Sequence, residues 1–130
     1  MGGVNGILMI FIGAGIGGVL RNAVNMAAMR MFGMGFPIGT MFINVLGSFL
    51  IGCIAGWLTF KAGHAWAVHA KLFIITGVLG GFTTFSSFSL DTALLVERGE
   101  MGLAALYVGG SVAISLAAVF GGLALMRALA

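Results

Sequence analysis

Charged residues are scarce in this sequence. Only 7% of its 130 residues are Asp, Glu, Lys or Arg, whereas soluble domains carry about 25%. So few charges do not cover a water-facing surface, which excludes a soluble globular domain. The basic residues are scattered singly and form no patch, so the net charge of +3 does not indicate a nucleic-acid partner.

Groups with catalytic or metal-binding chemistry are also scarce. Cys53 is the single cysteine, which excludes a disulfide framework and a cysteine-rich zinc site. The three acidic residues form no catalytic pair in the sequence, and neither a Ser/His/Asp arrangement nor a phosphate-binding lysine loop is present. The sequence therefore predicts that the protein is not an enzyme.

Long apolar segments make up most of what remains, since 61% of the residues are hydrophobic. A membrane-spanning helix needs about 20 mostly apolar residues. Four such segments are present, at 4–29, 38–60, 70–96 and 102–126. We expect one all-α transmembrane domain over residues 1–130, surrounded by lipid and crossing the membrane four times. The first segment is expected to be a retained helix, because it lacks the basic start and clear cleavage site of a signal peptide.

The basic residues are balanced between the two sides of the membrane. With four spans, both termini and the 61–70 loop share one side, which would hold Lys61, Lys71 and Arg127. The other side would hold Arg21, Arg30 and Arg98. Orientation normally follows an excess of Lys and Arg on the cytoplasmic side, and three against three gives no excess. We therefore expect insertion in both directions and an antiparallel homodimer with two-fold symmetry.

One segment of the third span departs from the pattern of a plain membrane helix. Residues 77–89 read Gly-Val-Leu-Gly-Gly-Phe-Thr-Thr-Phe-Ser-Ser-Phe-Ser, with three glycines, two threonines and three serines. Irregular backbone at membrane depth is tolerated only where protein or water satisfies it, and such breaks handle ions or solutes in transporters. We therefore expect the third helix to be broken in mid-membrane. Freed carbonyls would suit a hard cation such as Na⁺, whereas the ring edges of Phe85 and Phe88 and nearby donors would suit a small anion.

Small and polar side chains recur every four residues in the other spans. Three helix faces result, carrying Gly13, Gly17, Arg21 and Asn25, then Thr40, Asn44, Ser48 and Gly52, and then Tyr107, Ser111 and Ser115. Close packing between membrane helices explains most of these positions without an ion. Asn44 is different, because an amide inside a span is costly unless it has partners. A structural role and a role in ion handling both remain open for it.

Four spans, balanced charges, Asn44 in the second span and the segment 77–89 together resemble the CrcB/Fluc family of fluoride channels. The resemblance extends over the whole chain. It implies a small dual-topology protein that forms an antiparallel homodimer in the cytoplasmic membrane of a microbe and passively exports F⁻ through two pathways. It also implies one central Na⁺ that is structural. A small multidrug cation exchanger of similar size is the alternative, and it is disfavoured because such exchangers need a carboxylate in the first span, which is absent here.

The resemblance also assigns residues. It implies a fluoride pathway made by Asn44, Phe85, Phe88, Ser86, Tyr107, Ser111 and Ser115, with Arg21 near the vestibule. Backbone carbonyls of Gly80 and Thr83 from both copies would hold the Na⁺. Two positions depart from the family pattern, since Asp91 stands where glutamate is common and Ser87 where threonine is usual. Asp91 keeps the carboxylate on a shorter side chain.

Overall fold

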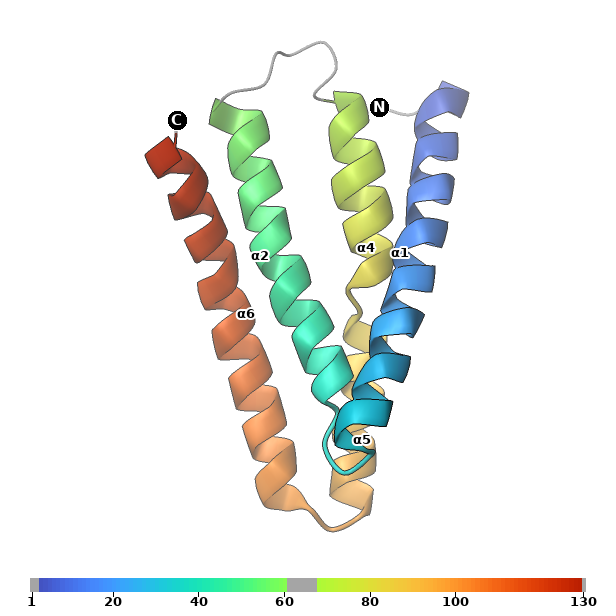
Figure 1. Cartoon of the computed structure of the whole chain (residues 1–130), viewed down its shortest axis with the longest axis vertical. Coiled ribbons are helices and arrows are strands. Elements are labelled where there is room, and N and C mark those ends of the chain that lie inside the picture. Colours follow the sequence, from blue (N-terminus) through green and yellow to red (C-terminus); the bar gives the residue numbers. More distant parts are fainter. Residues whose placement is uncertain (1–2, 61–67, 130) are drawn as a thin grey trace.

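The computed structural model describes residues 3–60 and 68–129, and these residues form helices joined by short connections (Figure 1). The elements in chain order are α1 (Gly3–Phe32), α2 (Ile38–Phe60), the π-helix η1 (Lys71–Leu79), α4 (Gly80–Phe82), α5 (Phe85–Glu97) and α6 (Met101–Leu129). No strand occurs in the described ranges.

The prediction of four membrane-spanning segments is confirmed. Helical stretches long and apolar enough to cross a membrane cover Gly3–Phe32, Ile38–Thr59, Val68–Glu97 and Met101–Leu129. The first and last reach Phe32 and Leu129, past the predicted ends at 29 and 126. The expected ends followed the positions of charged residues, whereas a single arginine in the last turn of a helix faces the negative end of its dipole and does not stop it.

Backbone chemistry at the connections determines where the helices end. Gly33, at φ 77°, follows α1, and the only proline, Pro37, directly precedes α2. Helix α5 ends in a Schellman motif, in which the N–H of Gly99, at φ 78°, donates to the carbonyl of Val96 and the N–H of Glu100 to that of Leu95. A residue with a side chain adopts such a positive φ only at a cost, so glycine is favoured at both helix ends.

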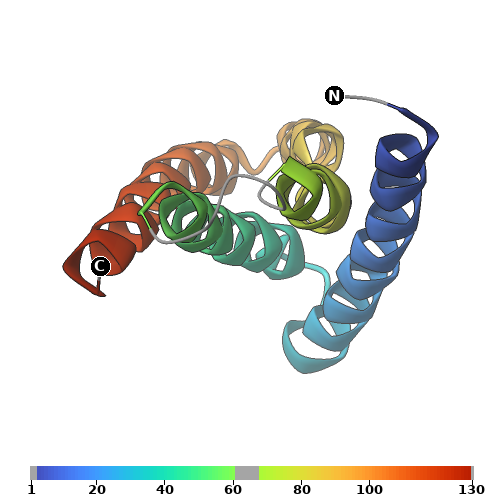
Figure 2. The ribbon, with the colours of Figure 1, turned by 90° about the horizontal axis from the view of Figure 1, so that it is seen from above.

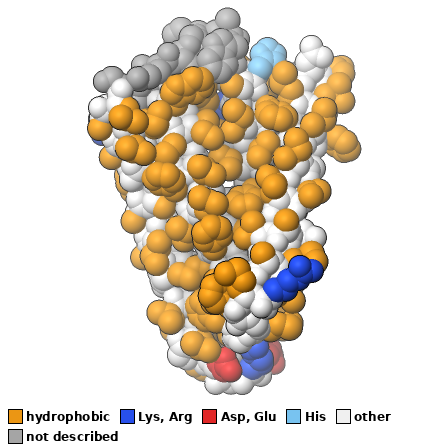
Figure 3. Space-filling view, viewed as in Figure 1, with side chains coloured by type: hydrophobic (Ala, Val, Ile, Leu, Met, Phe, Trp, Pro, Cys, Tyr) orange, Lys and Arg blue, Asp and Glu red, His pale blue; other side chains and the backbone are white. Residues whose placement is uncertain are grey.

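The four spans lie side by side, with α2 and the third span between α1 and α6 (Figures 1 and 2). The start of α1, the end of α2, the start of the third span and the end of α6 all lie at one end of the molecule (Figure 1). This arrangement agrees with the sides assumed for the charge balance, although Lys61 of that balance lies outside the described residues. Figure 3 shows hydrophobic side chains over most of the visible face, with acidic residues gathered at the opposite end.

Glycines bring α1 against the first half of the third span. An added Cβ at Gly13 would lie 2.6 Å from the carbonyl oxygen of Phe73, and one at Gly81 would lie 2.5 Å from that of Ala14. At Gly17 an added Cβ would meet the carbonyl oxygen of Val78. The two backbones are therefore too close for any side chain at these positions, which is the packing expected between small residues in membranes.

The first half of the third span is wound as a π-helix. Gly80, directly after η1, donates its N–H to the carbonyls of Ile75 and Gly77, and the bond to Ile75 spans the five residues of π geometry. Nine consecutive residues in this form are unusual, because π-helices occur mostly as single-turn bulges near functional sites. Hydropathy does not distinguish an α-helix from a π-helix, so η1 could not be predicted from the sequence pattern.

Candidate functional site

Helix geometry is interrupted in the third span between Phe82 and Phe85. Thr83 is extended with φ −79° and ψ 157°, and Thr84 with φ −155° and ψ 121°. Helix α5 then begins with Thr84 as its N-cap, whose Oγ1 accepts a hydrogen bond of 3.1 Å from the Ser87 N–H. Threonine is a favoured N-cap because its hydroxyl satisfies a backbone donor at the helix start.

Asn44 of α2 holds the interrupted backbone. Its Nδ2 donates to the carbonyl oxygen of Thr84 at 3.0 Å, and its Oδ1 accepts from the Thr84 N–H at 2.8 Å. Both backbone groups of this extended residue are therefore paired, as buried backbone requires. The structural role that the sequence left open for Asn44 is thus present, and one of its two amide N–H groups is not used by Thr84.

The same hydrogen bonds release two carbonyls from their helical partners. In a continuous α-helix the Gly80 carbonyl accepts from the Thr84 N–H, and the Thr83 carbonyl accepts from the Ser87 N–H. Here the Thr84 N–H donates to Asn44 and the Ser87 N–H donates to the Thr84 hydroxyl. The Thr83 hydroxyl bonds back to the Leu79 carbonyl at 2.9 Å, so it is not a substitute donor for either group.

A cavity of about 260 Å³ lies beside the interruption. Its lining comes from α2, the interruption with α5, and α6, and consists of Asn44, Ser48, Ile51, Thr83, Thr84, Phe85, Phe88, Ser111, Val112 and Ser115. Five residues assigned to the fluoride pathway are therefore brought together here. None of the lining side chains carries a charge.

Two hydroxyls at this cavity are buried and unpaired. The Oγ atoms of Ser111 and Ser115 have no hydrogen-bond partner among the described residues. A buried polar atom without a partner costs free energy, and a serine in a helix can normally bond back to its own backbone. The two hydroxyls are therefore available to a guest in the cavity.

Aromatic rings continue from the cavity into the protein. The ring centroids of Phe85 and Phe88 are 5.6 Å apart, those of Phe88 and Tyr107 are 5.1 Å apart, and those of Tyr107 and Phe36 are 5.5 Å apart. Phe85 is 78% exposed in the single subunit, whereas Tyr107 is fully buried. Phe88 packs against the small core of Leu95, Ala104 and Tyr107, so it is anchored on one side.

Tyr107 lies outside the cavity lining and is paired with an acidic residue. Its hydroxyl donates to Oδ2 of Asp91 at 3.0 Å. The aspartate that departs from the family pattern therefore reaches a partner on α6 in spite of its shorter side chain. The pair ties α5 to α6 below the interruption.

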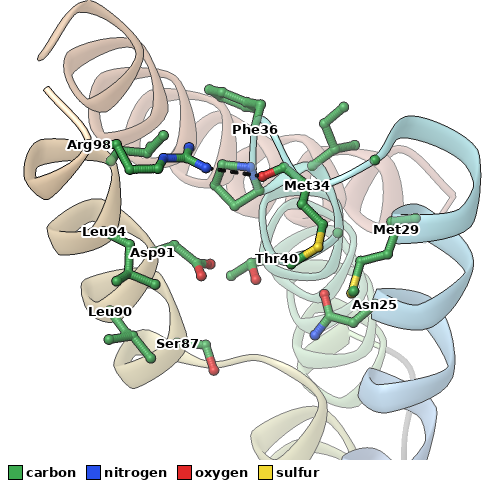
Figure 4. A pocket seen from close by; sticks show the side chains of 16 residues that line it. Asn25, Met29, Met34, Phe36, Thr40, Ser87, Leu90, Asp91, Leu94 and Arg98 are labelled. Atoms are coloured by element: carbon green, nitrogen blue, oxygen red, sulfur yellow. Dashed lines mark hydrogen bonds between the residues drawn. The ribbon is translucent and has the colours of Figure 1, made fainter. Parts of the chain in front are cut away.

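Asp91 also lines a second cavity, of about 380 Å³, where the end of α1 and the start of α2 face α5 (Figure 4). Thr40, Ser87 and Asn25 contribute polar groups there, and Arg98 stands at its edge (Figure 4). The Arg98 guanidinium donates to the carbonyls of Gly35 at 2.8 Å and Met34 at 3.4 Å, and so ties α5 to the connection between α1 and α2. Sequence reasoning missed this cavity, because its walls come from two segments, 25–40 and 87–98, that are more than 45 positions apart in the chain.

The remaining predicted residues lie apart from the first cavity. Arg21 is half-buried on α1 and lines neither cavity described above. Ser86 is exposed, with its Oγ 3.3 Å from the Thr84 Oγ1. Gly80 is exposed at the end of η1. A single subunit therefore assembles the core of the expected pathway and leaves these three at its surface or edge.

Comparison with known proteins extends over nearly the whole chain. The family model described as CrcB-like protein, Camphor Resistance (CrcB), matches residues 8–123. Proteins named fluoride-specific ion channel FluC, from Rhodopseudomonas palustris (strain BisB5), and FluC 2, from Nitrobacter hamburgensis, are 55% and 56% identical over 122 and 124 residues, covering 94% of this chain and 97% of each relative. A FluC from Granulibacter bethesdensis is 53% identical over 122 residues, 94% of both chains. This multi-pass membrane protein therefore belongs to the CrcB-like family.

Proposed function

We propose that this protein is a fluoride-specific ion channel that conducts F⁻ passively and is not an enzyme. The observation that carries the proposal is the uncharged cavity beside the interruption, where the Ser111 and Ser115 hydroxyls are buried without partners. A small anion that leaves its water shell needs substitute hydrogen-bond donors, and these hydroxyls supply them. The names of the FluC relatives agree with this choice of ion.

Neighbouring residues would complete the pathway. Phe85 and Phe88 would line it with their positive ring edges while their bulk excludes water. Asn44 would offer the amide N–H that Thr84 leaves free, and Tyr107 would hold Phe88 in place through their ring contact. Ser86 would extend the line of hydroxyls.

A second copy of the chain would complete the channel. Phe85 is 78% exposed in one subunit, and Gly80 also lies at the surface. An antiparallel homodimer would cover both, and the balanced basic residues of the sequence favour insertion in both directions. In such a dimer the half-buried Arg21 of the first span would lie at a vestibule and attract anions.

Na⁺ is the proposed structural ion of this dimer. The Gly80 and Thr83 carbonyls have lost the N–H partners of a continuous helix, and carbonyl oxygens are suitable ligands for a hard cation. One pair from each copy would give four oxygens around the two-fold axis. The ion would fix the two interruptions relative to each other and is not expected to be transported.

The direction of flow follows from the membrane potential. HF crosses lipid uncharged and dissociates in a more alkaline cytoplasm, where F⁻ accumulates. A potential negative inside drives an anion outward by about 2.3 kcal/mol per charge per 100 mV. A selective passive channel in the cytoplasmic membrane of a microbe would therefore lower cytoplasmic fluoride without a pump. The cation-exchanger alternative finds no support, because α1 carries no acidic side chain.

Ion efflux from liposomes tests the proposal directly. Purified protein is reconstituted into liposomes loaded with KF or KCl in Na⁺-containing buffer, and efflux is followed with ion-selective electrodes after addition of valinomycin. Rapid F⁻ release with negligible Cl⁻ release is the expected result. Efflux of F⁻ no faster than from protein-free liposomes would contradict the proposal.

A further inference from the structure

Ser48 is a hydroxyl at the first cavity to which the family resemblance gave no role. It lies on α2 one turn after Asn44 and lines the cavity together with Ser111 and Ser115 of α6. Hydroxyls from two different helices therefore border the same uncharged space.

The Ser48 hydroxyl is not engaged by its own helix. Hydroxyls in a helix or directly after one commonly bond back to the carbonyl four residues earlier, and three threonines of this chain do so. The pairs are Thr59 with Ala55 at 2.8 Å, Thr83 with Leu79 at 2.9 Å and Thr92 with Phe88 at 2.9 Å. Ser48 makes no hydrogen bond within the part of the chain that the structure describes. Its proton is therefore free to be donated into the cavity.

We propose that Ser48 donates a hydrogen bond to the anion in this cavity, alongside Ser111 and Ser115. The inference rests on the proposed fluoride channel and adds a ligand from α2. With no charged side chain in the lining, stabilisation of an anion there depends on the number of neutral donors. Hydrogen bonds to an ionised acceptor are stronger than those between neutral groups, so the loss of one donor should slow conduction.

Fluoride efflux from liposomes containing Ser48→Ala, Ser48→Thr and wild-type protein tests this role. Ser48→Ala is expected to slow F⁻ efflux about tenfold, the effect of one lost hydrogen bond to a charged group. Ser48→Thr keeps the hydroxyl and should retain the wild-type rate. Thr59→Ala is the matched control, because it removes a hydroxyl from the same helix that is already bonded to Ala55. It should also conduct at the wild-type rate.

The outcomes separate this inference from the proposed function. A wild-type efflux rate for Ser48→Ala would overturn the role of Ser48 and leave the channel standing. Slow efflux from both Ser48→Ala and Ser48→Thr would also overturn it, because packing and not donation would then be the cause. Wild-type protein that releases no F⁻ would overturn both proposals. If Ser48→Ala does not elute as a single species, Ser48→Cys replaces it, and a wild-type rate for that variant overturns the inference.

Discussion

The two halves of the third span are held in place by different means. The half before the interruption, η1 and α4, packs against α1, whereas the half after it, α5, packs against α6. Main-chain contacts at Gly13, Gly17 and Gly81 fix the first half. Side chains fix the second half, through the hydrogen bond between Tyr107 and Asp91 and the ring contact between Phe88 and Tyr107. The interruption thus connects a half that is positioned by main-chain packing against α1 to a half that is positioned by side-chain contacts with α6.

The largest effect is expected where the backbones meet. Gly17→Ala places a methyl group against the Val78 carbonyl, and main-chain atoms on both sides leave it no room. We expect loss of the folded protein, seen as a missing monodisperse peak in gel filtration and efflux at the level of empty liposomes.

Gly15→Ala is the control for this change, since a Cβ at Gly15 meets nothing within 4 Å. It should elute and conduct like the wild type. A Gly17→Ala protein that behaves normally would show that the first half is not fixed by backbone contact.

The next largest effect is expected at the junction of the halves. Asn44→Ala leaves the N–H and carbonyl of Thr84 without their partner, at a cost of about 1–3 kcal/mol for each buried group. Thermal unfolding in detergent should show this loss of stability, and F⁻ efflux should fall at least about tenfold. Asn22→Ala, which removes an exposed amide from α1, should change neither. If Asn44→Ala and Asn22→Ala were equally stable, Asn44 would not be the residue that stabilises the interrupted backbone.

A smaller effect distinguishes the two phenylalanines of α5. Phe85→Ile and Phe88→Ile should each slow F⁻ efflux about fivefold with dimers intact, since each loses an aromatic contribution of about 1 kcal/mol. Only Phe88→Ile should also lower the thermal stability, because Phe88 packs on Tyr107 and Phe85 is exposed. If both variants conduct F⁻ at the wild-type rate, Phe85 and Phe88 do not line the pathway.

The smallest effect is expected from Thr83→Ser. The new side chain keeps a hydroxyl that can bond to the Leu79 carbonyl, and the backbone carbonyl is unchanged. Dependence of efflux on Na⁺, measured against N-methylglucamine, should therefore stay as in the wild type. Gly80→Pro removes an N–H that is hydrogen-bonded to the carbonyls of Ile75 and Gly77. It should weaken the Na⁺ dependence of efflux, because it distorts the backbone. Loss of the Na⁺ dependence in Thr83→Ser would count against ligation by main-chain oxygens.

The local sequence pattern was sufficient to predict the membrane-spanning segments, because length and hydropathy determine which segments can cross a membrane. Four-residue spacing also placed Asn44 and Ser48 on one face, and Ser111 and Ser115 on another, and both faces border the same cavity. Within 77–89 the backbone leaves helical geometry at Thr83 and Thr84, whereas the three glycines of that segment lie in η1 and α4.

The sequence pattern did not predict which residues of different helices contact each other. The pairing of Asn44 with Thr84 spans 40 residues, and that of Arg98 with Gly35 spans 63. Helical periodicity predicts on which face of its own helix a residue lies. It does not predict which neighbouring helix that face contacts, or at which height along that helix. The position of Asn44 within a span left its structural role open and did not predict that Thr84 is the partner of its amide.

The hydrogen bonds of Asn44 and Thr84 also determine how the molecule would respond to a mutational scan. The oxygens released at Gly80 and Thr83 belong to the main chain, which every substitution retains. Substitutions at Gly80 and Thr83 therefore test the backbone conformation and do not remove the carbonyl oxygens. The residues whose replacement would redirect those oxygens are Asn44 for the Gly80 carbonyl and Thr84 for the Thr83 carbonyl. A scan would therefore assign the importance of the oxygens to positions that do not contain them.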